Sequence, residues 1–171
     1  MKNVIALALK RDNVVASTQF AVLVGIAVVA PFFGNQFVTG PIVNATLFVS
    51  TILLGTQAGI MVGLMPSVIA LSVGTLPAPL APMIPYIMLS NTILVIVFSL
   101  LSKKYWTAIF SSSILKFVFL YLMSLIVVGF MPNKELAQSV AFMMSWPQLV
   151  TALAGGVLAY SFLKYKKRAA L

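Results

Sequence analysis

The chain has 171 residues, of which 61% are hydrophobic and only 8% are charged, and its net charge is +9. Soluble domains devote about a quarter of their residues to charge, so this composition excludes an ordinary soluble globular protein. Residues 13–102 contain no Asp, Glu, Lys, Arg or His, which predicts an integral membrane protein. The chain also lacks Cys and His, which excludes disulfides, thiolate metal sites and the commonest general base.

Hydropathy and helix breakers divide the chain into six predicted membrane spans that form one transmembrane domain, 1–171. The spans are residues 18–33, 41–54, 57–73, 86–101, 108–130 and 137–163. The second span is short for a hydrocarbon layer of about 30 Å at a rise of about 1.5 Å per residue. A cluster of prolines, Pro77, Pro79, Pro82 and Pro85, predicts an ordered loop before the fourth span. We therefore expect an all-α, six-helix transmembrane bundle.

The basic residues flank the apolar segments, which argues against a nucleic-acid-binding surface. They are Lys2, Lys10 and Arg11 before the first span, Lys103 and Lys104 after the fourth, and Lys164, Lys166, Lys167 and Arg168 after the last. Lys and Arg accumulate in the cytoplasmic loops of membrane proteins. We therefore expect a multi-pass protein of a prokaryotic cell membrane, with both termini in the cytoplasm, in contact with lipid and without nucleic acid as a partner.

Small residues recur at four-residue intervals on two of the predicted spans. They are Ser17, Ala21 and Gly25 on the first span, and Gly55, Gly59 and Gly63 on the third. Such faces allow helix backbones to approach closely. Packing within the bundle explains either stripe, and docking of another subunit is the competing interpretation for the first. Gly155 and Gly156 indicate a further close contact.

Lys116 is the one basic residue inside a predicted span, and no carboxylate lies in any span to pair with it. An ammonium near the middle of the membrane costs about 3 kcal/mol on insertion scales unless it finds water, a partner or the interface. Two interpretations remain open. The side chain either extends to the cytoplasmic headgroups along the face of residues 111–113, or it lines a cavity that receives an anionic ligand.

Several polar side chains in or beside the spans are candidate contacts for a solute. They are Asn35, Asn44, Asn91, Lys116, Tyr121 and Gln148. A buried amide in lipid must be hydrogen-bonded, so bonding between helices is the alternative for each amide. Amide, aromatic and cationic groups together suit a small flat or anionic organic molecule.

The spans carry no carboxylate of the kind that couples transport to protons or sodium. The chain also lacks a phosphate-binding Gly-x-x-x-x-Gly-Lys loop. Any ATP hydrolysis would therefore belong to another polypeptide. We expect no catalytic residues, no cofactor and no metal site in this chain.

The order of these features resembles the substrate-capture membrane subunit, or S component, of energy-coupling factor (ECF) transporters, which are ABC systems for vitamin uptake. The resemblance covers essentially the whole chain. Its most specific stretches are residues 40–44, Gly-Pro-Ile-Val-Asn, then residues 54–63 from Leu54 to Gly63, and the proline-rich loop 76–86 that leads into Met-Leu-Ser-Asn at residues 88–91.

This resemblance implies a mechanism. An S component binds a vitamin or similar micronutrient near its outer side, under a lid formed by the loop after the first helix. It then docks on a transmembrane coupling subunit that is driven by a pair of ATPases. The family's Ala-x-x-x-Ala docking face would match Ala21 and Gly25, with Ser17 extending it. Nickel and cobalt members use an N-terminal His motif, which this chain lacks.

Two other classes of protein compete with this interpretation. In a structural or assembly subunit of a larger membrane complex, Lys116 and the amides would only join helices, and there would be no solute. A membrane enzyme is the weaker alternative, because without His, Cys or a buried carboxylate no base is positioned to activate a hydroxyl.

Overall fold

The computed structural model describes residues 2–74 and 78–169, with side chains from 13 to 74 and from 80 to 168. Every regular element in these residues is a helix. In chain order they are α1 (Lys2–Val29), the 3-10 helix η1 (Ala30–Phe33), α2 (Gln36–Leu54), α3 (Thr56–Ser72), the 3-10 helix η2 (Ala78–Met83), α4 (Ile84–Leu100), α5 (Tyr105–Gly129), α6 (Lys134–Met143) and α7 (Trp146–Ala169).

Five helical segments of the described chain are long and apolar enough to cross a membrane. They are Asn13–Phe33, Gln36–Leu54, Leu80–Leu100, Tyr105–Gly129 and Lys134–Arg168, and the apolar helix α3 is shorter at 17 residues. The prediction of an all-helical membrane protein is confirmed by these helices, whereas the count of six spans is not.

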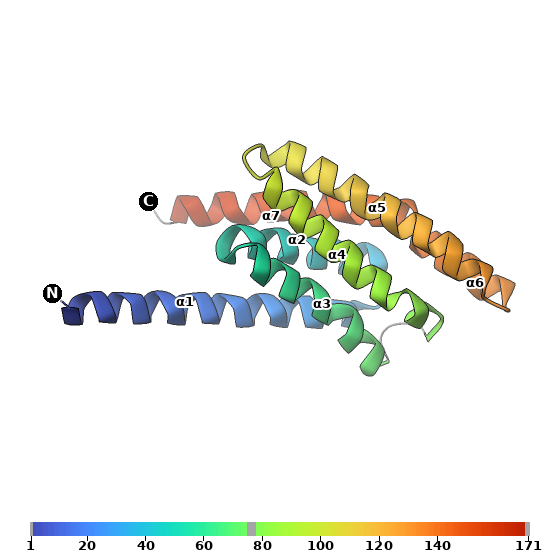
Figure 1. Ribbon diagram of the computed structural model, residues 1–171, viewed down its shortest axis with the longest axis horizontal. Coiled ribbons are helices and arrows are strands. Elements are labelled where there is room, and N and C mark those ends of the chain that lie inside the picture. The colour runs from blue at the N-terminus through green and yellow to red at the C-terminus, as the bar shows by residue number, and fades with distance from the viewer. Residues whose placement is uncertain (1, 75–77, 170–171) are drawn as a thin grey trace.

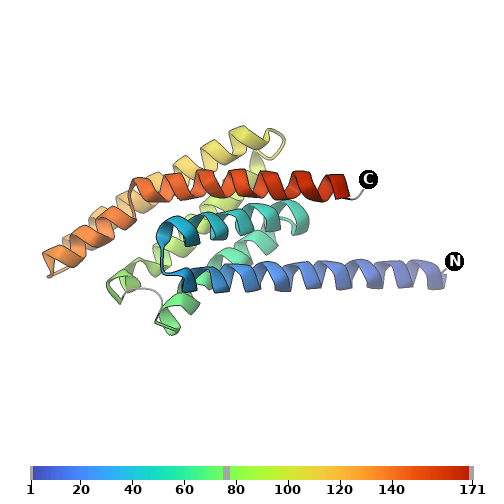
Figure 2. The same ribbon diagram turned by 180° about the vertical axis from the view of Figure 1, so that it is seen from behind.

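The helices run back and forth along a common direction. The start of α1 and the end of α7 lie at one end of the bundle, and the loop between α4 and α5 lies toward that end (Figure 1). The α1–α2 connection and α6 lie at the opposite end, as the reverse view also shows (Figure 2). We call these the terminal end and the distal end.

Helix α2 begins at Gln36, earlier than the start at 41 expected from the sequence. Asn35 caps the helix, because its side-chain oxygen accepts a hydrogen bond from the Phe37 backbone N–H at 2.8 Å. Pro41 then lies inside the helix, as membrane helices tolerate. This earlier start makes α2 a full-length span of 19 residues and brings Gln36 into its first turn.

The last predicted span, 137–163, is divided by a break between α6 and α7. Pro147 is the second residue of α7 and has no N–H to donate to the Met143 carbonyl one turn earlier. The two helices therefore meet at an angle at the distal end (Figure 2). The break leaves the Met143 carbonyl open to side-chain donors.

Helices α2 and α7 form the most extensive contact in the bundle. Two glycines allow this close approach. A Cβ at Gly155 would lie 2.6 Å from the Asn44 Cβ and 2.9 Å from the Pro41 carbonyl oxygen. A Cβ at Gly40 would lie 2.7 Å from the Thr151 Cβ. Only glycine fits at these points, and their close contact holds Asn44 beside α7.

Buried apolar side chains form two clusters. The larger one contains residues of α1, α2, α3, α4, α5 and α7, including Phe48, Val62, Leu94, Phe98 and Ile109. The smaller one contains Leu80, Met83, Leu120, Val140 and Met144. The smaller cluster is built around η2 and the α6–α7 break, so it belongs to the distal end.

Candidate functional site

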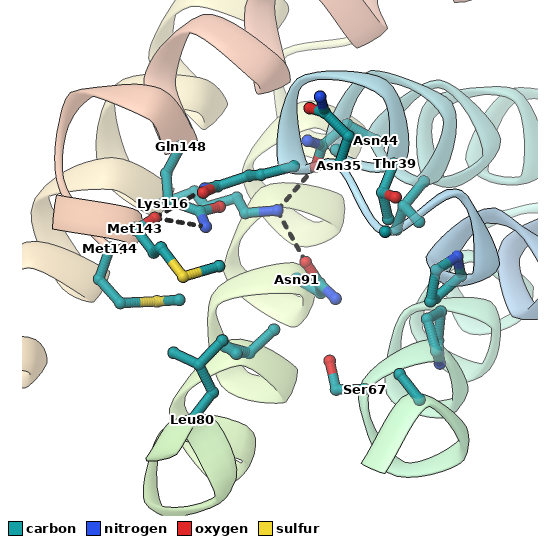
Figure 3. A pocket seen from close by; sticks show the side chains of 18 residues that line it. Asn35, Thr39, Asn44, Ser67, Leu80, Asn91, Lys116, Met143, Met144 and Gln148 are labelled. Carbon is teal, nitrogen blue, oxygen red and sulfur yellow. Dashed lines mark hydrogen bonds between the residues drawn. The ribbon is translucent and has the colours of Figure 1, made fainter. Parts of the chain in front are cut away.

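Lys116 of α5 is buried, with 3% of its surface exposed. Its Nζ donates hydrogen bonds to Asn44 Oδ1 of α2 at 2.7 Å and to Asn91 Oδ1 of α4 at 2.8 Å (Figure 3). The ammonium thus lies between two amides inside the bundle and does not extend to the headgroups. Of the two interpretations of Lys116, the geometry agrees with the one in which it lines a cavity.

Asn91 is held in place by helix α3. Its Nδ2 donates to the Gly63 carbonyl at 2.8 Å, and a Cβ at Gly63 would lie only 3.1 Å from the Asn91 Cβ. The small residue at 63 therefore lets the amide reach the α3 backbone. Because the same amide accepts from Lys116 through its oxygen, both ends of Asn91 are used.

The orientations of these amides follow from their partners. An ammonium only donates and a carbonyl only accepts, so the atom of Asn44 that bonds to Lys116 is its oxygen. The Asn44 amide N–H groups accordingly remain unused by the described residues. One of the three N–H donors of the Lys116 ammonium also remains unused by them.

A second set of polar side chains lies at the α6–α7 break. Gln36 Nε2 donates to the Met143 carbonyl oxygen at 2.7 Å, and Gln148 Nε2 donates to the same oxygen at 3.1 Å. The Gln148 side chain points toward this carbonyl in Figure 3. These bonds connect the start of α2 with the start of α7 through the carbonyl that Pro147 leaves open.

These groups line one cavity of about 220 Å³. Its polar lining consists of Asn35, Gln36, Thr39, Asn44, Ser67, Asn91, Lys116 and Gln148, and its apolar lining includes Pro31, Val43, Pro66, Leu80, Ile87, Met143 and Met144. Residues from the α1–α2 connection and the α6–α7 break belong to the lining, so the cavity lies in the distal half of the bundle. Figure 3 shows Lys116 and Asn91 near its centre, with Leu80 and Ser67 on one side.

Five of the six sequence-predicted solute contacts line this cavity: Asn35, Asn44, Asn91, Lys116 and Gln148. The sixth, Tyr121, does not. Its side chain is 41% exposed and stacks beside Phe117 at 6.0 Å between ring centroids. Tyr121 is five positions along α5 from Lys116, which places it on a different face of the helix.

Sequence reasoning did not choose Gln36, Ser67 or Met143 as site residues. The sequence pattern places Gln36 in a loop, and nothing near it in the chain indicates the carbonyl that it reaches across the bundle. Ser67 is 8% exposed, lines the cavity and makes no hydrogen bond to the described residues. Ser67 follows Pro66, a proline inside helix α3. This position is the one sequence feature that could have identified Ser67 as a site residue.

The small-residue stripe of α1 lies on the outside of the bundle. Ser17, Ala21 and Gly25 are all exposed, and a Cβ at Gly25 would meet no atom within 4 Å. Beside Gly25 runs an apolar groove that includes Val22 and Ile26. The described chain therefore leaves this face unpacked, unlike the stripe of α3.

The described residues contain no group of three or more His, Cys, Asp or Glu side chains able to hold a metal ion. Glu135 is not among the residues that line the cavity. Within the part of the chain whose side chains are described, the Lys116 ammonium thus has two neutral amide partners and no carboxylate in the cavity wall.

Comparison with known proteins identifies a family. The family model described as the ECF transporter, substrate-specific component, matches residues 16–163. This match covers most of the chain and confirms the resemblance drawn from the sequence. No curated protein and no solved structure matched the chain.

Proposed function

Because this chain belongs to the family of ECF transporter substrate-specific components, we propose that it captures a small anionic micronutrient, such as a vitamin, in the cavity around Lys116. A coupling subunit and a pair of ATPases would supply the energy for uptake. The membership itself makes the chain a substrate-binding transport subunit. The kind of solute, the partners and the residues involved are the proposal.

The observation that carries the proposal is the buried ammonium of Lys116, for which the described residues of the cavity lining supply no counter-charge. Burial of a charge is costly unless the charge is paired and hydrogen-bonded. Asn44 and Asn91 supply hydrogen bonds but no negative charge. An anionic group of the solute would complete the site and would gain a charge-assisted hydrogen bond in a region of low dielectric constant.

The charge distribution supports an outward-facing cavity. Lys103 and Lys104 lie in the loop between α4 and α5, toward the end that carries both termini. Lys and Arg favour the cytoplasmic side, so the terminal end faces the cytoplasm and the distal end faces outward. The cavity would then receive its solute from outside the cell, as uptake requires.

The partners are inferred from the family and from the exposed face of α1. We infer that Ser17, Ala21 and Gly25 contact the transmembrane coupling subunit. Small residues allow helices in a membrane to approach closely. All three side chains of this stripe are exposed, and no described atom lies within 4 Å of a Cβ at Gly25.

A structural or assembly subunit is the second candidate, and one observation favours it. The bonds of Lys116 join α2, α4 and α5, which is what a purely structural polar contact would do. This alternative requires no solute, so a binding experiment separates the two.

The test is native mass spectrometry of the detergent-purified protein, expressed in rich medium, followed by extraction of any bound compound. We expect one anionic compound per protein molecule in the unmodified chain and its loss in Lys116→Met. Lys134→Met is the matched control, because Lys134 is exposed and does not line the cavity. A folded protein without solute, which also fails to co-purify with a coupling subunit and ATPases, would favour the structural subunit.

A further inference from the structure

The cavity offers unused hydrogen-bond donors at Lys116 and Asn44 and unused amide oxygens at Gln36 and Gln148, and this set of groups restricts the solute. Resting on the proposed function, we infer that the solute is a compact monocarboxylic acid. Its carboxylate would bind at Lys116 and Asn44, and an N–H or O–H group elsewhere on the molecule would bind at Gln36 and Gln148.

The donor side is defined by Lys116 and Asn44. Both carry N–H groups that no described residue accepts, because Lys116 uses two of its three donors and Asn44 uses only its oxygen. Both residues are buried and line the cavity. A carboxylate accepts several hydrogen bonds and carries the charge that the ammonium lacks.

The acceptor side is defined by Gln36 and Gln148. Each uses its amide nitrogen on the Met143 carbonyl oxygen, which accepts and does not donate. The oxygen of each amide is therefore an acceptor, and it receives no hydrogen bond from the described residues. Each amide nitrogen also keeps one further N–H. A hydroxyl of the solute, which both donates and accepts, would therefore be bound at these amides.

The single cation argues for one negative charge on the solute. A phosphate monoester carries more than one charge near neutral pH, and among the described residues Lys116 is the only basic side chain in the lining of this cavity. A dianion would leave buried charge uncompensated, which is strongly unfavourable. This distinguishes a carboxylate from a phosphate ester.

The volume of the cavity limits the size of the part of the solute that the cavity encloses. A cavity of about 150 Å³ accommodates benzene, so one of about 220 Å³ suits on the order of ten non-hydrogen atoms. The apolar part of the lining includes Leu80, Ile87 and Met144, so the remainder of the solute is apolar. A single ring or a short chain that carries an acid and a separate donor meets these conditions.

The probes for the test are 3-hydroxybenzoate and 4-hydroxybenzoate, which have about ten non-hydrogen atoms, as the cavity requires. Their primary amides remove the charge, their methyl ethers remove the donor, and phenyl phosphate carries the alternative anion. Binding to the full-length protein in detergent is measured by isothermal titration calorimetry and by thermal shift. Because a charge-assisted hydrogen bond is worth more than a neutral one, we expect the acids to bind at least about tenfold more tightly than the amides. We expect them to bind about two- to tenfold more tightly than the methyl ethers.

Two variants test the assignment of each side. In Gln148→Met, which keeps the side-chain length, we expect the preference for a hydroxyl over a methyl ether to shrink while the preference for acid over amide persists. In Lys116→Met we expect the preference for acid over amide to disappear. Tyr121→Phe is the control on α5, because Tyr121 is exposed and outside the cavity, and it should bind all probes as the unmodified protein does.

The outcomes distinguish this inference from the function on which it rests. Equal binding of acid and amide, tighter binding of phenyl phosphate, or an unchanged hydroxyl preference in Gln148→Met would overturn the inference. So would failure of every probe while native mass spectrometry recovers a phosphorylated or larger anionic solute, although the proposed function would stand. If neither the probes nor any recovered compound bind the folded protein, the proposed function itself fails.

Discussion

The small-residue stripes of α1 and α3 look alike in the sequence but have opposite surroundings. On α3, a Cβ at Gly59 would collide with Thr51 Oγ1 and lie 3.0 Å from a Val95 methyl group. On α1, a Cβ at Gly25 would meet nothing within 4 Å. A four-residue spacing thus identifies a face that another helix is able to approach closely, and it does not say whether that helix belongs to the same chain.

Gly55 refines the comparison further. Its spacing places it in the α3 stripe, but it lies between α2 and α3 with φ of 91°, and a Cβ there would meet no atom within 4 Å. A positive φ favours glycine. The conformation of the chain, and not helix packing, requires glycine at this position, so only Gly59 and Gly63 form the packed face of α3.

The largest expected effect is that of Gly59→Leu. The added side chain would overlap Thr51 and Val95, and overpacking of a tight core costs about 1–3 kcal/mol or more. We expect a loss of about 3 kcal/mol in the free energy of unfolding, measured by titration with SDS in mixed micelles. A change as small as that of an exposed position would mean that the α2–α3–α4 contact is looser than described.

The second prediction concerns the exposed stripe. Gly25→Leu should change the free energy of unfolding by no more than about 0.5 kcal/mol, as exposed substitutions usually do. It should also abolish co-purification with the coupling subunit, because the helices would no longer approach closely. Solute binding by the isolated protein should be unchanged. If docking survives, the stripe is not the docking face.

A smaller effect is expected where the α3 stripe meets the cavity. The added methyl of Gly63→Ala would lie 3.1 Å from the Asn91 Cβ and 3.3 Å from a Leu47 methyl group. We expect a loss of about 1 kcal/mol in stability and weaker solute binding, because Asn91 bonds to the Gly63 carbonyl and to Lys116. Gly129→Ala is the matched control, since a Cβ there meets no atom within 4 Å. Equal effects of both variants would contradict this connection.

The smallest effect is expected at Ser113, whose buried Oγ has no hydrogen-bond partner among the described residues. Ser113→Ala should leave stability unchanged or raise it by up to about 1 kcal/mol, because an unsatisfied buried hydroxyl is unfavourable. Ser112→Ala is the comparison, since Ser112 Oγ donates to the Ile109 carbonyl at 3.2 Å. Chemical denaturation of both variants measures the difference, and a marked loss at Ser113 would indicate a partner such as a bound water.

Parts of the site were predictable because their sequence signal is local. A lysine inside an uncharged span and amides in apolar surroundings need partners wherever they lie, so Lys116, Asn44 and Asn91 stood out. The role of Gln36 was not predictable. It depends on the carbonyl that Pro147 leaves open more than a hundred residues later, and local patterns carry no information about such a contact.

The fold, like the site, has features that the sequence predicts and features that it does not. Apolar length and charge indicate membrane helices, but the predicted boundaries near prolines are wrong. The sequence predicts a helix start at Pro41, although the cap at Asn35 begins α2 earlier. The chemistry of Tyr121 suits a solute contact, and only the orientation of α5 shows that it faces away from the cavity. Helix rotation is set by packing against neighbours, which hydropathy does not encode.

The sequence is sufficient to establish that this protein lies in a membrane and that its predicted spans carry a lysine without a carboxylate partner. These conclusions follow from desolvation costs and from missing residue types, which depend only on composition and spacing. The tertiary structure alone decided that Lys116 lies between Asn44 and Asn91, that Gln36 and Gln148 share one carbonyl, and which glycines are packed. Those contacts join residues far apart in the chain, and only the packing of the helices brings them together.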